Sequence, residues 1–136
     1  KIDQDSPCFS RALTWRERDK ESACDLQLWL PVQMDDGVWV SAVRLTGLGF
    51  PPLSAMPGED PLGAMLNAMS FARSVMAQKG GVFLFGDRQW ESAGLPLWLD
   101  KGFEPSRLAD LEAQALELRD RTFDAVRTEF GPSGRS

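Results

Sequence analysis

The chain has 136 residues, a net charge of −5 and no histidine. This acidic balance argues against non-specific nucleic-acid binding, which needs Lys and Arg to neutralise phosphates. The lack of histidine removes the commonest metal ligand and the base of Ser–His and Cys–His sites. No apolar run approaches the roughly 20 residues that span a bilayer, so we expect neither nucleic acid nor membrane as a partner.

The length is typical of a single domain, 1–136, with loose tails expected at 1–7 and 131–136. Cys8 and Cys24 are not arranged as CxxC, and we expect no metal and no cofactor. Two reduced cysteines in or near strands are the simpler interpretation. A disulfide between them is expected only if the protein is exported.

The first half of the chain predicts three antiparallel strands. Apolar and polar residues alternate from Phe9 to Trp15, and the mixed-charge run 16–22 predicts a solvated hairpin tip. Leucines at every second position start a second strand at Leu26, and the AspGly pair at 36–37 predicts a hairpin into a third strand, 38–47.

A two-residue hairpin loop fixes the expected register. It places on the core face three pairs: Leu28 with Leu45, Leu30 with Val43, and Met34 with Trp39. Trp29 would then lie opposite Arg44 on the outer face, as a cation–π pair. A four-residue loop keeps these partners or shifts them by two, without changing the faces.

Residues 47–58 contain three prolines and three glycines, which predicts an irregular segment. Its apolar residues, Phe50 among them, indicate that it covers the core or forms part of a binding surface. A helix is predicted to follow from Pro61, with Asp60 as N-cap and Gly80 and Gly81 as its stop.

The apolar residues of this first helix form two stripes. The stronger contains Leu62, Met65, Leu66, Met69, Ala72 and Met76, and the weaker contains Ala64, Ala68, Phe71 and Val75. The run 82–85, ValPheLeuPhe, predicts a strand buried on both faces, and 97–99 predicts a short edge strand.

A second helix is predicted over 105–130. One stripe holds Leu108, Leu111, Ala115, Leu118, Thr122 and Val126, and another holds Leu116, Phe123 and Phe130. The predicted fold class is therefore α+β: an antiparallel sheet, made of a three-strand meander and a fourth strand, with two helices in the order βββαβα.

Catalytic chemistry has little support. Asp36 and Asp60 already have turn and capping roles, and Asp87 and Glu91, which follow a strand, lack an obvious partner. A hydrolase using Asp87 and Glu91 is the least favoured alternative. We expect that the protein is not an enzyme.

Five tryptophans are many for 136 residues, and Trp and Arg anchor protein interfaces. Each Trp has packing as its alternative role. Together with the acidic loops they predict a protein-binding surface. The candidate partner-binding residues are Trp29, Asp35, Asp36, Arg44, Phe50, Glu59, Asp87, Trp90, Glu91 and Trp98.

Three features occur in order: the Trp-bearing AspGly hairpin, AspProLeuGlyAlaMetLeuAsnAlaMet at 60–69, and GlyGlyValPheLeuPheGly at 80–86. This pattern, over about residues 9–99, resembles small bacterial β-meander-plus-helix domains, which in turn resemble immunity proteins of toxin–immunity pairs. The resemblance implies a cytoplasmic protein that neutralises a toxin or effector domain by occluding its basic surface. The alternative is an adaptor or chaperone-like protein that forms a homodimer through its C-terminal helix.

Overall fold

The computed structural model describes residues 3–86, 88–89, 95 and 104–129. Its contacts divide the chain into two compact units, unit 1 (Lys1–Leu97) and unit 2 (Trp98–Ser136), and each is described by itself. The prediction of one domain over 1–136 stays a prediction. The predicted edge strand at 97–99 and the tail at 131–136 lie outside the described residues.

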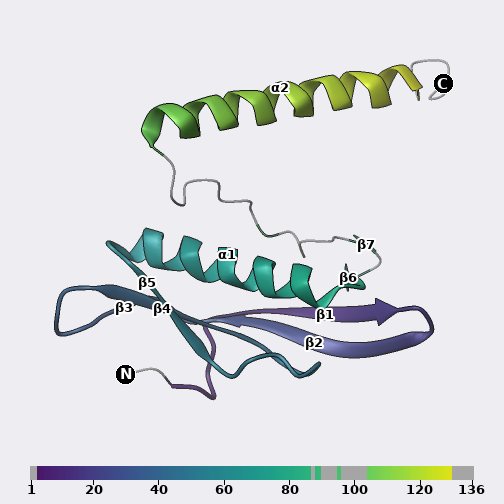
Figure 1. Ribbon diagram of the computed structural model, residues 1–136. Helices are drawn as coiled ribbons and strands as arrows, with labels where there is room; N and C mark the ends of the chain where they lie inside the picture. Colours follow the sequence, from purple (N-terminus) through teal and green to yellow (C-terminus); the bar gives the residue numbers. More distant parts are fainter. Residues whose placement is uncertain (1–2, 87, 90–94, 96–103, 130–136) are drawn as a thin grey trace. The chain divides into compact units, whose positions relative to one another are not determined.

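Unit 1 is an antiparallel sheet with one helix, and its α+β character confirms the predicted class (Figure 1). More strands are present than the four predicted. The elements are β1 (Phe9–Glu17), β2 (Lys20–Leu28), β3 (Val32–Gln33), β4 (Trp39–Leu45), β5 (Ser54–Gly58), α1 (Pro61–Lys79), β6 (Val82–Phe85) and β7 (Arg88–Gln89). Unit 2 contributes the second helix, α2 (Pro105–Glu129).

The sheet is built around β4, β2, β1 and β6, which neighbour one another in that order, with β7 beyond β6. β4 pairs with β2 through 43–45, with β3 through 39–40 and with β5 through 39–43. Because a strand has two edges, β2 and β3 share one edge of β4 and β5 takes the other. The proline-rich segment 47–58 therefore ends in a strand that the sequence did not predict, with Pro57 tolerated because β5 lies at the edge.

The core lies between the sheet and α1. Leu13, Cys24, Leu26, Leu28, Val43, Leu45 and Phe83 pack there against Ala68, Ala72 and Met76. Leu48, Phe50 and Met56 pack against the same cluster, so the segment 47–58 covers the core. β6 is less buried than predicted: Phe83 is buried but Phe85, on the same face, is exposed, and Val82 and Leu84 on the other face are half-buried.

The buried face of α1 consists of Ala64, Ala68, Ala72 and Met76. The larger residues Met65 and Met69 are only half-buried, and Leu62 is exposed. The buried face therefore combines members of both predicted stripes, with Ala72 and Met76 from the stronger one and Ala64 and Ala68 from the weaker one. Small side chains let the helix backbone approach the sheet closely, and the larger ones then flank the contact.

The ends of α1 follow the prediction. Asp60 has extended backbone angles and its Oδ1 accepts a hydrogen bond from the Gly63 amide at 2.6 Å. Pro61 occupies the first helical position, and Gly80, with φ +75°, ends the helix. Capping by an acidic side chain also places negative charge at the positive end of the helix dipole.

The β3–β4 hairpin has a three-residue loop, Asp35 to Gly37. The Gly37 amide donates to the Met34 carbonyl at 2.9 Å and the Met34 amide to the Val38 carbonyl at 2.8 Å, with φ +90° at Gly37. This is a type I turn followed by a glycine bulge. The sequence predicted an even number of loop residues, and an odd number exchanges the two faces of β3 relative to β4.

β2 nevertheless presents the predicted side chains to the core, because one extra residue between β2 and β3 cancels the shift that the odd loop causes. Leu28 pairs with Val43 and Val32 with Val40, so four steps along one strand match three along the other. Leu28 and Leu45 are both buried on the core face, as predicted. The prediction for Leu30 and Met34 is wrong, since both are exposed.

Candidate protein-binding surfaces

Four acidic side chains gather at one end of unit 1, which we call the acidic end: Asp35 and Asp36 in the β3–β4 loop, and Glu59 and Asp60 between β5 and α1. They are brought together because Trp39, at the start of β4, pairs with Gly58, at the end of β5. Figure 1 shows the β3–β4 loop and the start of α1 at the same end of the sheet. All four residues are exposed.

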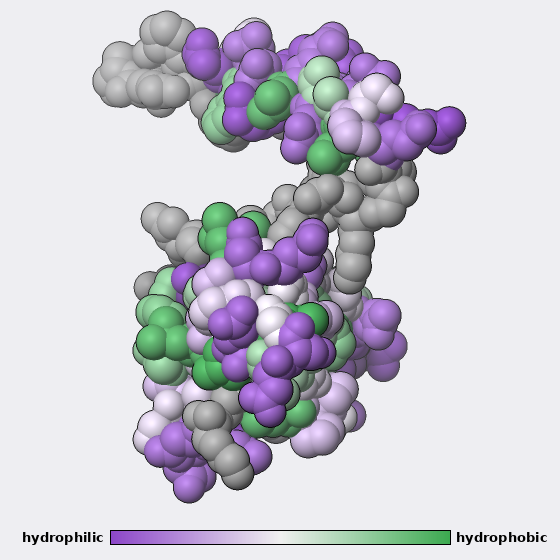
Figure 2. Space-filling model, turned by 90° about the vertical axis from the view of Figure 1, so that its left-hand side faces the viewer, coloured by the Kyte–Doolittle hydropathy of each residue, from purple (hydrophilic) through white to green (hydrophobic). Residues whose placement is uncertain are grey.

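Large apolar side chains are exposed in the same segments. Met34 and Val38 flank the hairpin loop, and Leu62 lies in the first turn of α1. In Figure 2, which faces this end of unit 1, hydrophilic atoms are interspersed with hydrophobic ones. Two of the acids also have structural roles, because Asp36 Oδ1 accepts from the Val38 amide at 3.0 Å and Asp60 caps α1.

On the outer sheet face, Trp29 and Arg44 are in contact as expected, but they are not direct partners in the strand register. The Arg44 guanidinium carbon lies 5.2 Å from the centre of the Trp29 ring, which confirms the cation–π pair. In the register, however, Arg44 lies opposite Gln27 and its Nε donates to the Gln27 Oε1 at 2.8 Å. The predicted Trp29–Arg44 register is therefore off by two residues.

Trp29 is also inaccessible, with an exposed fraction of 3%. Residues 3–8 cover this face: Trp29 Nε1 donates to the Asp3 carbonyl at 2.7 Å and Arg44 Nη2 to the Gln4 carbonyl at 3.1 Å. The Cys8 amide donates to the Leu28 carbonyl at 2.9 Å. A residue buried in this way has no surface for a partner, so the expectation that Trp29 is an exposed anchor is wrong.

The remaining predicted site residues fall into two groups. Phe50 is half-buried and stacks on Phe83, with ring centres 6.4 Å apart, so its position is explained by core packing. Asp87, Trp90, Glu91 and Trp98 lie outside the described residues.

Both cysteines are free. Cys24 lies opposite Leu13 in the β1–β2 pair, five residues along β1 from Cys8. At about 3.3 Å per strand residue, they are much farther apart than the roughly 7 Å that a disulfide tolerates between Cα atoms. Burial, with a smaller effect of the Asp25 charge, raises the pKa of the Cys24 thiol to about 11, so this thiol stays protonated and unreactive at neutral pH.

A cavity of about 570 Å³ opens between the start of β1 and α1. Phe9 and Arg11 lie on its sheet side, Met65 and Met69 on its helix side, and Leu95 also lines it. The Arg11 guanidinium carbon lies 4.9 Å from the centre of the Phe85 ring. The lining is mainly apolar and the volume falls in the range of small-ligand sites.

In unit 2, α2 buries none of its side chains. Leu116, Leu118, Phe123 and Val126 have exposed fractions between 45% and 61%. Phe123 and Val126, with Thr122 and Arg119, line a shallow apolar depression on the helix. The predicted periodicity is therefore present as one wide apolar face, which we call the α2 face, made of both stripes: Leu108, Leu111, Ala115, Leu116, Leu118, Thr122, Phe123 and Val126.

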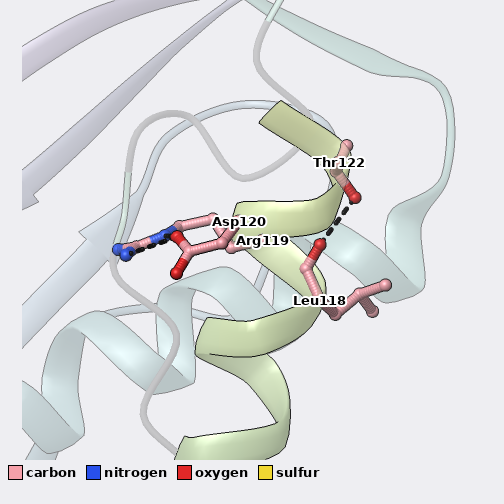
Figure 3. Close-up of polar contacts among 4 residues, drawn as sticks. All are labelled: Leu118, Arg119, Asp120 and Thr122. Carbon is pink, nitrogen blue, oxygen red and sulfur yellow. Dashed lines mark hydrogen bonds and ion pairs between the residues drawn. The ribbon is translucent and has the colours of Figure 1, made fainter. Parts of the chain in front are cut away.

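Two polar side chains on or beside the α2 face, Thr122 and Arg119, are paired locally (Figure 3). Thr122 Oγ1 donates to the Leu118 carbonyl at 2.8 Å, one turn earlier. Arg119 Nη2 and Nε donate to Asp120 Oδ1 at 3.0 and 3.2 Å. A hydroxyl that is bonded to its own helix presents its methyl group outwards and leaves no unpaired polar atom when the face is covered.

Among the described residues, no group of three or more His, Cys, Asp and Glu side chains could hold a metal ion. In the same part of the chain, no helix has the length and apolar character needed to cross a membrane. Comparisons with protein-family models, curated proteins and solved structures find no match to this chain.

Proposed function

We propose that this protein is a non-enzymatic, protein-binding module of the cytoplasm, and that the α2 face is its main binding element. The observation that carries the proposal is the combination of a 25-residue helix with no buried side chain and large apolar residues that are about half exposed. Contiguous apolar surface of this kind marks interaction sites in proteins. Helices in proteins gain most of their stability from packing an apolar face against another element.

Site-specific photo-crosslinking in the native host tests the proposal. A photoreactive phenylalanine analogue replaces Leu118 on the α2 face or, as the control, Glu117, which is also exposed but points away from the middle of the α2 face. We expect a covalent adduct with a polypeptide from position 118 and none from position 117. No adduct from position 118, or equal yields from the two positions, would overturn the proposal.

A second, more specific function is an immunity-type protein that occludes the basic surface of a toxin. The acidic end supports it, because Asp35, Asp36, Glu59 and Asp60 are exposed there beside Met34, Val38 and Leu62. Charge complementarity of this kind mainly raises the association rate. The buried position of Trp29 removes the aromatic anchor from this idea, so the apolar contacts come from the residues around the acids.

The immunity-type function is tested with the purified product of the neighbouring gene. The chain should inhibit that product, and the double variant Asp35→Lys/Asp36→Lys should associate at least about tenfold more slowly at low salt. The control is the double variant Glu17→Lys/Asp19→Lys, which places the same change of charge at the exposed tip of the β1–β2 hairpin. Absence of inhibition, or equal slowing by the control, would contradict this function.

A further inference from the structure

Two charged residues interrupt the α2 face. Glu112 and Arg119 lie seven residues apart, which is about two helical turns, so they project from the same side of the helix. Steps of three or four residues connect them to Leu108, Leu116 and Phe123. They therefore lie between the two apolar stripes, and any partner that covers the whole face also covers them.

Burying a charge without a counter-charge is strongly unfavourable. A helical partner for the α2 face must place a basic side chain opposite Glu112 and an acidic one opposite Arg119, two turns away. A second copy of α2 running in the opposite direction meets this requirement, because the Glu112 of each copy then lies opposite the Arg119 of the other. Two parallel copies would place like charges opposite each other, which is destabilising.

We infer that the partner of the α2 face is a second copy of this chain, bound through an antiparallel α2–α2 contact. This inference rests on the proposed function of α2. The two-fold axis passes between Ala115 and Leu116, midway between the two charges. Around it, Ala115 of one copy meets Leu116 of the other, and Leu108 meets Phe123, so a smaller residue packs against a larger one in each pair.

The existing contacts of α2 are compatible with this pairing. Arg119 bonds Asp120 in an ion pair whose two side chains are more than half exposed, and such pairs contribute little to stability. The guanidinium is therefore available to Glu112 of the second copy. The symmetric overlap extends from Pro105 to Val126, about 33 Å at 1.5 Å per residue, so almost the whole helix takes part.

Sedimentation equilibrium of the full chain tests the inference through charge exchange. The natural chain should sediment as a reversible dimer. Glu112→Arg and Arg119→Glu should each raise the dimer Kd by at least about tenfold, and the double variant should restore it to within about threefold. Glu117→Arg, the same change on the opposite side of α2, should leave the Kd unchanged. These residues are exposed, and circular dichroism checks that each variant folds.

Disulfide cross-linking tests the direction of the two helices. In a Cys8→Ser background, which removes the exposed native thiol, Ala115→Cys lies beside its own counterpart at the axis and should be oxidised to a covalent dimer. Leu108→Cys lies far from its counterpart in an antiparallel pair and should not. Cross-linking of both variants indicates a parallel pair and overturns the inference.

The remaining outcomes separate this inference from the proposed function. A chain that is monomeric at all concentrations, or a double variant that fails to restore the dimer, overturns self-association through these charges. The proposed function still stands if a monomeric chain forms an adduct with a different polypeptide from position 118. It fails if position 118 gives no adduct of any kind, either with a second copy or with another protein, or if positions 118 and 117 give equal yields.

Discussion

Replacement of Gly58 by Ala should be among the most destabilising single-methyl changes in unit 1. Gly58 ends β5 where it lies against the first turn of α1. A Cβ at this position would lie 2.2 Å from the Ala64 nitrogen and 2.6 Å from the Ala64 Cα. Both atoms belong to the helix backbone, so no change of side-chain rotamer can relieve the contact.

The size of the effect follows from these distances. Carbon atoms pack at about 3.5–4.0 Å, so β5 and the start of α1 must separate by more than about 1 Å. Overpacking of a well-ordered site costs about 1–3 kcal/mol, and backbone contacts belong at the upper end. Alanine restricts the unfolded chain more than glycine does, which offsets about 0.4–1 kcal/mol of this loss in the free energy of unfolding. We expect the free energy of unfolding to fall by about 2–3 kcal/mol.

Urea unfolding followed by tryptophan fluorescence measures this change, with an expected midpoint roughly 1–2 M lower. The matched control is Gly37→Ala, where φ is +90° but no atom lies within 4 Å of the added Cβ, so that only the conformational penalty of roughly 1 kcal/mol applies. If Gly58→Ala loses no more stability than Gly37→Ala, the close contact between β5 and α1 is refuted.

Three other predictions concern single side chains of unit 1. Asp60→Ala should lower the free energy of unfolding by about 1 kcal/mol, because the Gly63 amide at the start of α1 loses its acceptor. Trp29→Phe should lower it by about 1–2 kcal/mol and speed hydrogen exchange in residues 3–8, because the Asp3 carbonyl loses its donor. The folded pKa of the Cys24 thiol, about 11, exceeds the ordinary value of 9.0. Stability should therefore be unaffected below about pH 8 and should fall as the pH rises from about 9 to 11, by up to about 3 kcal/mol, because only the unfolded thiol ionises there.

Each of these predictions has a control. Asp60→Asn keeps the side-chain acceptor and should lose less than half as much stability as Asp60→Ala. Trp39→Phe, a half-buried tryptophan in β4, should leave hydrogen exchange in residues 3–8 unchanged. The pH-dependent loss should be absent in Cys24→Ala, and an equal loss in that variant would show that other groups cause it.

The fold class, the caps of α1 and the position of α2 could be predicted because each depends on local chemistry. A capping carboxylate, a proline at the first helical position and a glycine stop act within a few residues of one another. The strand at 54–58 could not be predicted in this way. It is held by pairing with β4, a tertiary contact that overrides the irregular composition of the segment.

The surface was harder to predict than the core. Trp29, directly after β2, lies on the outer face of the sheet as predicted, but its burial depends on residues 3–8, which the sequence presents as a polar, loose tail. Neither predicted stripe of α1 alone matches its buried face, because hydrophobicity ranks Met above Ala, whereas close helix–sheet packing selects mostly the smaller residue. The α2 face could be predicted from the sequence, because its apolar residues recur every three or four positions. Whether such a face is covered depends on the rest of the fold.

The three-residue loop of the β3–β4 hairpin has a consequence for how this sheet tolerates insertions and deletions. The three-residue loop shifts the strand pairing by one residue, and the extra residue between β2 and β3 shifts it by one more. Together the two shifts restore the original faces, so β2 presents its leucines to the core. Removing one residue at either place alone should slide β3 by one position along β4. Removing one at each place should leave both strands in phase, so tolerated length changes here are expected in pairs.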